Sequence, residues 1–286
     1  MARCNVCYRN CEIKEGEVGF CGVRGYSDHK IVPLNYGKIT GLALDPIEKK
    51  PLARFMPGTM VLSLGSYGCN LRCPFCQNYE ISWSRQAYTY GQNAEYMSPE
   101  DIAELAYQYR NRGNIGVAYT YNEPLVGYEF VRDTAKLVRS YGMKNVLVTN
   151  GMASIDVLSE IIPYIDAMNI DLKGFTDTYY NLLLKGNRQM VMDFIKEAVK
   201  GCHVELTTLI IPGENDADNE IEALSAWIAG LKDERGNVIG RSVPLHISRF
   251  FPRFHMQDRD ATDVNKIYHL TDIARLNLDY VYTGNC

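Results

Sequence analysis

The sequence predicts an α/β fold in which parallel strands form an incomplete, laterally open (β/α)6 barrel of the TIM type. From about residue 60 onward, short β-branched segments alternate with longer amphipathic segments, and this alternation implies right-handed crossovers and a parallel sheet. About six such units are visible, whereas a closed barrel of this kind has eight. Polar residues also gather where each strand ends, which is where barrel enzymes build their active sites. A doubly wound open sheet is the alternative.

The barrel elements follow one another from residue 59 to the C-terminal residues. We expect strands at 59–66, 115–121, 144–151, 166–174, 203–213 and 243–252, with 279–285 as a candidate short seventh strand. We expect helices at 98–113, 125–141, 154–162, 218–231 and 263–277, and helical structure from 174 to 200 with a break near Gly186. The first of these helices has clear boundary signals, because Ser98 suits the N-cap, Pro99 the first turn and Gly113 the end.

Composition fits one large domain with a smaller attachment. The chain has 286 residues, of which 46% are hydrophobic and 22% are charged. We divide it into a cysteine-rich metal-binding subdomain at 1–30, a connecting segment or hairpin at 31–60 and the partial barrel at 61–286.

Charge and hydropathy exclude several classes of partner. The net charge of −4 gives no general attraction to nucleic acid or anionic membranes. No apolar run reaches the about 20 residues that a membrane-spanning helix needs, and the first residues lack the apolar core of a signal peptide. We therefore expect a cytoplasmic monomer with no membrane partner and no nucleic-acid partner.

Nine cysteines in a reducing compartment indicate metal ligands or reactive thiols rather than disulfides. Seven of them lie in two groups, and the remaining two, Cys202 and Cys286, are expected to be a packed thiol and a tail thiol.

The second group, Cys69, Cys73 and Cys76, has the spacing C-x3-C-x2-C and no fourth cysteine nearby. A 4Fe-4S cluster needs four ligands. Three thiolates would therefore leave one iron open for a substrate. A zinc knuckle that borrows a distant Cys or His is the alternative, although Gly68 and Pro74 favour a tight loop over a finger.

The other strand ends add polar groups to the same edge of the sheet. In chain order these are Thr120 to Glu123, Thr149 and Asn150, Asp171 with Lys173, Thr207 and Thr208, and His246 with Arg249. Because residues two apart on a strand point the same way, Asp171 and Lys173 can hold an ammonium and a carboxylate together. A salt bridge of little energetic value is the alternative.

The segment GCNLRCPFCQN, with Phe75 before its third cysteine, resembles the cluster loop of the radical S-adenosylmethionine (SAM) superfamily. The segments DPIEKKPL, TYNEP, NIDLKG, TTLIIPG and LHISRFFP resemble those of the AmmeMemoRadiSam type within it. Those proteins are relatives of the pyruvate formate-lyase activating enzyme, which activates a glycyl-radical enzyme. The resemblance covers almost the whole chain.

The resemblance implies that Cys69, Cys73 and Cys76 hold the 4Fe-4S cluster and that SAM binds its fourth iron through amino and carboxylate groups. It assigns further SAM contacts to Asn122 and Glu123, to Thr149 and Asn150, and to Asp171 and Lys173. Many members have two glycines before the acid, where this chain has Tyr121 and Asn122. His246 and Arg249 are further candidates: a lone histidine is as often a core residue, and arginine suits a carboxylate or phosphate.

The implied reaction is reductive cleavage of SAM to methionine and a 5′-deoxyadenosyl radical, which abstracts hydrogen from a substrate. An electron donor such as flavodoxin or ferredoxin is then needed. The substrate is either a glycine of a partner protein, as for an activase, or a small molecule, peptide or nucleic acid. A non-catalytic electron-transfer or zinc scaffold protein is a third class, which leaves the polar strand ends unexplained.

The first cysteine group, Cys4, Cys7, Cys11 and Cys21, lies in a segment with few large apolar residues. Such a segment needs a stabilising cross-link. Four thiolates suit a closed structural zinc site and equally a second Fe–S cluster with no open iron. We favour zinc, and disulfides are the remaining alternative.

Overall fold

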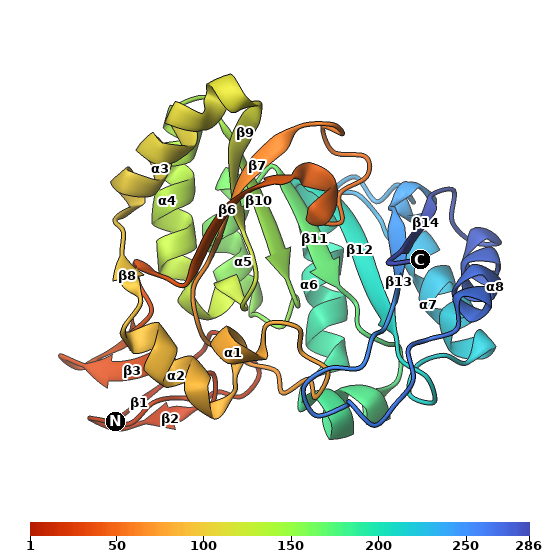
Figure 1. Cartoon of the computed structure of the whole chain (residues 1–286), viewed down its shortest axis with the longest axis horizontal. Coiled ribbons are helices and arrows are strands. Elements are labelled where there is room, and N and C mark those ends of the chain that lie inside the picture. Colours follow the sequence, from red (N-terminus) through yellow and green to blue (C-terminus); the bar gives the residue numbers. More distant parts are fainter.

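An eight-stranded, mostly parallel sheet forms the centre of the protein, whose computed structural model describes all residues from 1 to 286 (Figure 1). The sheet consists of β6 (Gly41–Pro46), β7 (Met60–Gly65), β9 (Asn114–Tyr119), β10 (Lys144–Thr149), β11 (Ala167–Asp171), β12 (His203–Ile210), β13 (Leu245–Arg249) and β14 (Val281–Gly284). The strand order is β14-β13-β12-β11-β10-β9-β7-β6, and only β6 is antiparallel to its neighbour. Because β6 and β14 do not pair, the barrel is incomplete, as the sequence predicts, and β14 confirms the candidate seventh strand.

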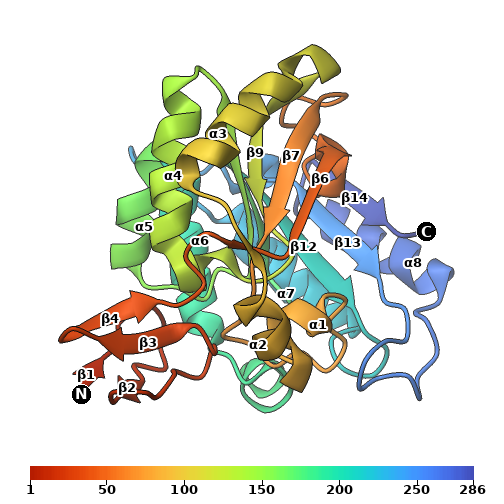
Figure 2. The same ribbon diagram turned by 60° about the vertical axis from the view of Figure 1, so that its left-hand side comes forward.

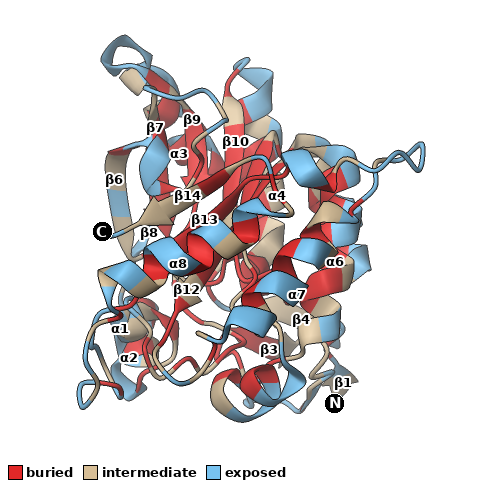
Figure 3. Cartoon of the chain, turned by 90° about the vertical axis from the view of Figure 1, so that its right-hand side faces the viewer, coloured by how far each residue is buried: buried red, intermediate tan, exposed pale blue.

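Six helices cover the outer face of this sheet (Figures 1 and 2). They are α3 (Pro99–Gln108), α4 (Tyr128–Ser140), α5 (Ile155–Ile161), α6 (Arg188–Gly201), α7 (Asp218–Ala229) and α8 (Val264–Arg275). Alternate strand residues such as Leu64, Leu147 and Ile170 join the buried helix residues in one apolar core. Figure 3 shows this arrangement, with the sheet buried and the outward faces of α7 and α8 exposed.

The start of α3 matches its sequence signals. The Ser98 hydroxyl accepts a hydrogen bond from the Asp101 amide, while the Asp101 carboxylate accepts one from the Ser98 amide. These reciprocal bonds form a capping box, which satisfies two amides that the helix itself leaves free. At the end of the following turn, Gly113 takes a left-handed conformation with φ 81°.

Residues 47–56 close the barrel at the N-terminal ends of its strands. Ile47 and Leu52 pack there against inward-facing strand residues, namely Val61, Ala118, Val146 and Ala167. The buried Glu205 carboxylate accepts hydrogen bonds from the amides of Ala53 (2.9 Å) and Arg54 (2.8 Å). We call residues 47–56 the plug. The plug leaves the C-terminal strand ends as the open mouth of the barrel.

Several elements were not predicted. Two short helices, α1 (Tyr79–Ser82) and α2 (Arg85–Gln92), follow the cluster loop. Within the helical span that was predicted up to residue 200, a π-helix (Tyr179–Leu184) precedes the expected break near Gly186, and α6 follows the break. Residues 31–60 contribute a strand of the central sheet, β6. Small strand pairs are β1 (Ala2–Arg3) with β2 (Glu12–Ile13), β3 (Arg24–Ser27) with β4 (Lys30–Pro33), and β5 (Lys38–Ile39) with β8 (Glu95–Tyr96). Single 3-10 turns occur at Ile47–Lys49, Tyr109–Arg112, Pro124–Gly127, Ile162–Tyr164 and Gly240–Ser242.

None of the helices combines the length and the apolar character needed to cross a lipid bilayer.

Candidate active site

A cavity of about 430 Å³ lies at the mouth of the barrel. Ten of the twelve barrel residues that are candidates for binding the cluster or SAM line it, because the C-terminal ends of parallel strands meet at one edge of a sheet. These ten are Cys69, Phe75, Cys73, Cys76, Asn122, Glu123, Thr149, Asn150, Asp171 and Lys173.

The loop that carries the three cysteines leaves β7 through Gly68, whose φ is 93°. A Cβ atom at this position would lie 2.5 Å from a Val23 side-chain carbon and 2.9 Å from the Cys21 carbonyl oxygen. Farther along, the Asn70 amide donates to the Met152 carbonyl oxygen (2.7 Å), and the Trp83 indole donates to the Cys73 carbonyl oxygen (3.2 Å). The loop is therefore fixed to the neighbouring βα loop and to the segment that joins α1 to α2.

Burial raises the pKa of all three thiols, to about 12 for Cys73. A thiolate is costly at such a site unless a cation is bound to it, and metal coordination removes the thiol proton outright. These donors fit an iron cluster chemically. No group of His, Cys, Asp and Glu side chains is already arranged around a metal ion, so binding would include rotation of these side chains toward the metal.

Glu123 connects the ends of β9 and β10. Its buried carboxylate accepts hydrogen bonds from the Thr149 hydroxyl (2.7 Å), the Asn150 amide (2.8 Å) and the Leu125 amide (3.0 Å). Burial outweighs these bonds and raises the pKa of Glu123 to about 7. A bound ammonium group beside this carboxylate would favour its charged form.

Asn150 links this hydrogen-bonded group to the cluster loop. Its side-chain amide donates to the Asn70 side-chain oxygen (2.9 Å) and lies 3.8 Å from the Cys69 sulfur. Glu123, Thr149 and Asn150 therefore form one hydrogen-bonded unit with the loop.

Asp171 and Lys173 lie on the same face of the chain, as their spacing predicts. The Lys173 ammonium donates to the Asp171 carboxylate at 2.8 Å, and both side chains are partly exposed to the cavity. Burial alone would lower the pKa of Lys173, but Asp171 and the Cys73 thiol outweigh burial and raise it. The pair therefore presents a firmly held ammonium and a partly open carboxylate to the cavity.

His246 and Arg249 do not line this cavity. The His246 ring lies 2.7 Å from the Glu205 carboxylate that anchors the plug, and the Arg249 guanidinium donates to the Thr262 carbonyl oxygen at 2.6 Å. The structure thus gives both residues partners within the protein. Ser248, between them on β13, faces the cavity instead.

Asp45 and Lys50 form a further part of the site that the sequence reasoning missed. The Lys50 ammonium and the Tyr121 hydroxyl each donate to the Asp45 carboxylate at 2.9 Å. Burial raises the pKa of Asp45, but these two bonds outweigh it and lower the pKa to about 2. Lys50 and Tyr121 line the cavity. Both Asp45 and Lys50 belong to the segment DPIEKKPL, which carries the family resemblance, so that segment was the available signal.

Comparison with known proteins agrees with this site. The model of the Radical SAM superfamily matches residues 64–224. The chain is 42% identical over 286 residues to an uncharacterized protein of Methanocaldococcus jannaschii, covering 99% of this chain and 81% of that protein. This protein therefore belongs to the radical SAM superfamily, a membership that implies a 4Fe-4S cluster and SAM.

More distant relatives have named activities or solved structures. The chain is 28% identical over 166 residues to the pyruvate formate-lyase 1-activating enzyme of Escherichia coli, covering 56% of this chain and 65% of that enzyme. It thus spans about two thirds of that relative's length. The structure of Streptococcus suis SuiB bound to S-adenosylmethionine superimposes with a TM-score of 0.58 at 13% identity, covering 79% of this chain and 52% of SuiB. That likeness shows a shared fold.

Proposed function

We propose that this protein reductively cleaves SAM to methionine and a 5′-deoxyadenosyl radical, and that the radical abstracts a hydrogen atom from a substrate at the barrel mouth. Cys69, Cys73 and Cys76 would hold the cluster. The bound cluster and SAM supply the radical chemistry, while the chain positions them and excludes water.

One observation carries this proposal: the three thiols share a single cavity with the Asp171–Lys173 pair. The cavity of about 430 Å³ falls in the size range of small-molecule sites. An ammonium and a carboxylate on one wall complement the carboxylate and amino groups of the methionyl part of SAM. Asn122 and Glu123 also line this cavity and would bind the SAM amine, with Thr149 and Asn150 on the ribose side.

For the substrate, we favour a glycine of a partner protein, as in the glycyl-radical activases. The similarity to the pyruvate formate-lyase 1-activating enzyme and the unpaired sheet edges β6 and β14, which leave the barrel open at its side, support this choice. A small molecule, peptide or nucleic acid is the alternative. An electron donor such as flavodoxin or ferredoxin, a monomeric state and a cytoplasmic location remain predictions from the sequence.

Deuterium transfer distinguishes these substrates. The reduced, reconstituted protein would be incubated with SAM and a candidate glycyl-radical protein whose glycines are dideuterated, and 5′-deoxyadenosine would be analysed by mass spectrometry. An activase should place deuterium in 5′-deoxyadenosine. Label transferred only from a deuterated small molecule would support the alternative, and no formation of 5′-deoxyadenosine under any condition would contradict the proposed reaction.

A further inference from the structure

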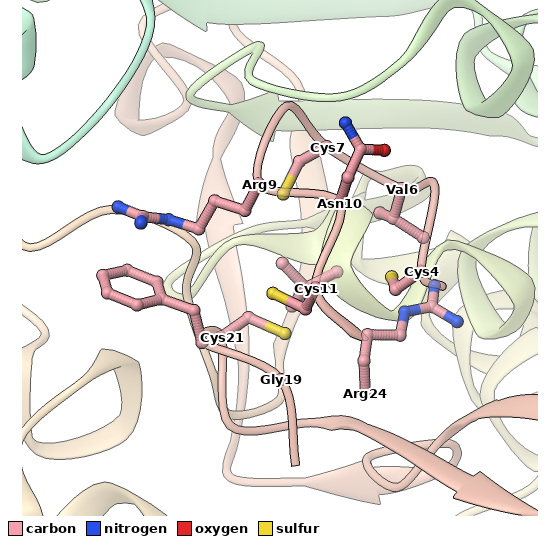
Figure 4. Close-up of a pocket in the computed structure, with 11 residues that line it drawn as sticks. Cys4, Val6, Cys7, Arg9, Asn10, Cys11, Gly19, Cys21 and Arg24 are labelled. Carbon is pink, nitrogen blue, oxygen red and sulfur yellow. The ribbon is translucent and has the colours of Figure 1, made fainter. Parts of the chain in front are cut away.

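The four N-terminal cysteines surround one small cavity, although they are spread over eighteen residues of chain (Figure 4). The Cys4 amide donates to the Cys11 carbonyl oxygen (2.9 Å), which brings these two residues together across the β1–β2 pair. Cys7 begins a tight turn in which the Asn10 amide donates to its carbonyl oxygen (3.2 Å). Cys21 arrives from the next loop, just before Gly22, whose φ is 80°.

The cavity between these four thiols is small, with a volume of about 10 Å³. Four thiolates around one ion are the donor set of a closed structural zinc site.

We propose that Cys4, Cys7, Cys11 and Cys21 bind one zinc ion, and that this zinc site holds the loop of the catalytic cluster in position. As in the cluster loop, the side chains would rotate toward the metal when it binds. The proposal concerns a second metal centre, so its outcome does not depend on SAM cleavage.

A buried arginine supports a ligand in this cavity. Arg24 lines the cavity and is 2% exposed, and its guanidinium makes two bonds to the Glu129 carboxylate. A further donor of this guanidinium, Nε, is buried without an acceptor. A buried donor that lacks a partner is costly. A metal-bound thiolate would provide both a negative charge and a sulfur acceptor close to it.

A hydrogen bond between main-chain atoms connects the two cysteine groups. The Cys69 amide donates to the Cys21 carbonyl oxygen at 3.3 Å, and the absence of a Cβ atom at Gly68 allows this approach. One residue earlier, the Phe20 carbonyl oxygen accepts a hydrogen bond from the Arg72 guanidinium, which also lies 3.7 Å from the Phe20 ring centroid. Residues 20–21 therefore hold both ends of the segment 69–72.

Other contacts attach the same subdomain to the barrel mouth. The Val6 carbonyl oxygen accepts from the Ser154 amide (2.8 Å), beyond β10, and the Tyr8 hydroxyl donates to the Lys185 carbonyl oxygen (2.8 Å), beyond β11. A metal ion that fixes Cys21 relative to Cys4, Cys7 and Cys11 would thus fix the Cys21 carbonyl relative to the barrel. Binding energy at such a site is largely folding energy for a segment with little core.

Metal analysis of the purified full-length chain tests the zinc site. Wild-type protein and a Cys202→Ser control, which alters a thiol outside both groups, should contain about one zinc per chain. A Cys7→Ser/Cys11→Ser variant should contain none. Absence of zinc from wild-type protein, about eight irons per reconstituted chain, or a full zinc equivalent in the double variant would overturn the proposal.

A cluster-free chain keeps the test valid if the double variant does not fold. The variant Cys69→Ala/Cys73→Ala/Cys76→Ala should retain one zinc. After substitution with cobalt, it should show the intense visible bands of tetrahedral cobalt thiolate, which iron absorption would otherwise obscure. Loss of zinc from this variant would overturn the proposal.

Hydrogen exchange tests the positioning role. In the Cys7→Ser/Cys11→Ser variant, or in wild-type chain stripped of zinc by a chelator, amides in residues 66–73 should exchange at least tenfold faster than in zinc-bound protein. Helix α8, which packs against β13 and β14 at one edge of the sheet, is the internal reference. Unchanged exchange in residues 66–73 after zinc loss would overturn the link to the cluster loop.

Discussion

Tyr121 occupies a backbone conformation that normally requires glycine, with φ 73°. Its hydroxyl donates to Asp45 at 2.9 Å, and the Lys50 ammonium lies 4.9 Å from its ring centroid. The absence of a side chain at Gly65 makes room for the ring, because a Cβ there would lie 2.8 Å from Tyr121 Cδ2. Specific contacts therefore hold a strained residue beside the barrel-mouth cavity, where many family members have glycine.

Removing the Tyr121 hydroxyl should be measurably destabilising. Tyr121→Phe leaves the Asp45 carboxylate with one hydrogen-bond donor fewer in a mostly buried site, which should cost about 1–3 kcal/mol. Denaturant unfolding at neutral pH measures the change, with the exposed Tyr141→Phe as the control. Equal stabilities of the two variants would show that the hydroxyl does not hold this residue.

Lys173 should affect SAM binding but not the metal. Lys173→Ala would remove the charge-assisted hydrogen bond that we propose between Lys173 and SAM, which should cost about 1.5–3 kcal/mol, or roughly a 10- to 150-fold increase in Kd. Iron content should stay at the wild-type value because Lys173 is not a cluster ligand. Calorimetric titration of the reconstituted variant measures the change. If the variant binds SAM with wild-type affinity, the Asp171–Lys173 pair is only a local salt bridge.

Glu123 should make the metal-free protein less stable as pH rises. Its pKa is about 7 in the folded chain and 4.5 in the reference state. Between these two pH values the unfolded chain binds fewer protons than the folded chain. The contribution of Glu123 to the free energy of unfolding is therefore fully present below about pH 4.5 and is lost as the pH rises to 7. The loss should be roughly 3 kcal/mol. Glu123→Gln should flatten the dependence, whereas the exposed Glu197→Gln should not; identical slopes in all three proteins would contradict the shift.

At the scale of elements, the plug depends on one carboxylate. Glu205 is fully buried and accepts bonds from the Ala53 and Arg54 amides while it also contacts His203 (2.9 Å) and His246 (2.7 Å). Strand β12 is thereby joined to a segment 152 residues earlier in the chain.

Glu205→Ala removes the buried acceptor that these groups share and leaves the buried His246 without its partner, so it should destabilise the protein by about 3–5 kcal/mol. Hydrogen exchange should locate the effect, with faster exchange at Ala53 and Arg54. Glu205→Gln, which keeps the shape and one acceptor, should lie between wild type and Glu205→Ala. Unchanged exchange at the plug in Glu205→Ala would show that other contacts hold it.

The strands and most helices could be predicted because their signals are local. Ser98 and Pro99 mark the start of α3, and Gly113 marks the end of the 3-10 turn that follows it. The short polar α2 has an N-cap serine, Ser84, but neither a proline in its first turn nor a glycine at its C-cap. Strand β6 was missed for another reason: an edge strand is recognised by its partner, β7, rather than by its own pattern.

For the whole molecule, the catalytic cavity was predictable because the fold brings together what the sequence separates. Once strands are parallel, their C-terminal ends meet at one edge of the sheet, so Glu123, Asn150 and Lys173 could be expected around one site. The buried pair of Asp45 with Lys50 could not be predicted as part of the site, because its place there depends on a contact with Tyr121, which is 76 residues away from Asp45. His246 was a candidate for the site because the sequence does not reveal its partner inside the protein, Glu205, which is 41 residues away.

Electron paramagnetic resonance of the anaerobically reconstituted protein, recorded before and after SAM addition, tests the central claim most directly. Three cysteines should hold four irons and leave one iron open, so the signal of the reduced cluster should shift when SAM binds. Alanine at Cys69, Cys73 or Cys76 should abolish the signal and SAM cleavage, whereas Cys202→Ala should preserve both. A cluster signal that stays unchanged when SAM is added, or SAM cleavage by iron-free wild-type protein, would contradict the account.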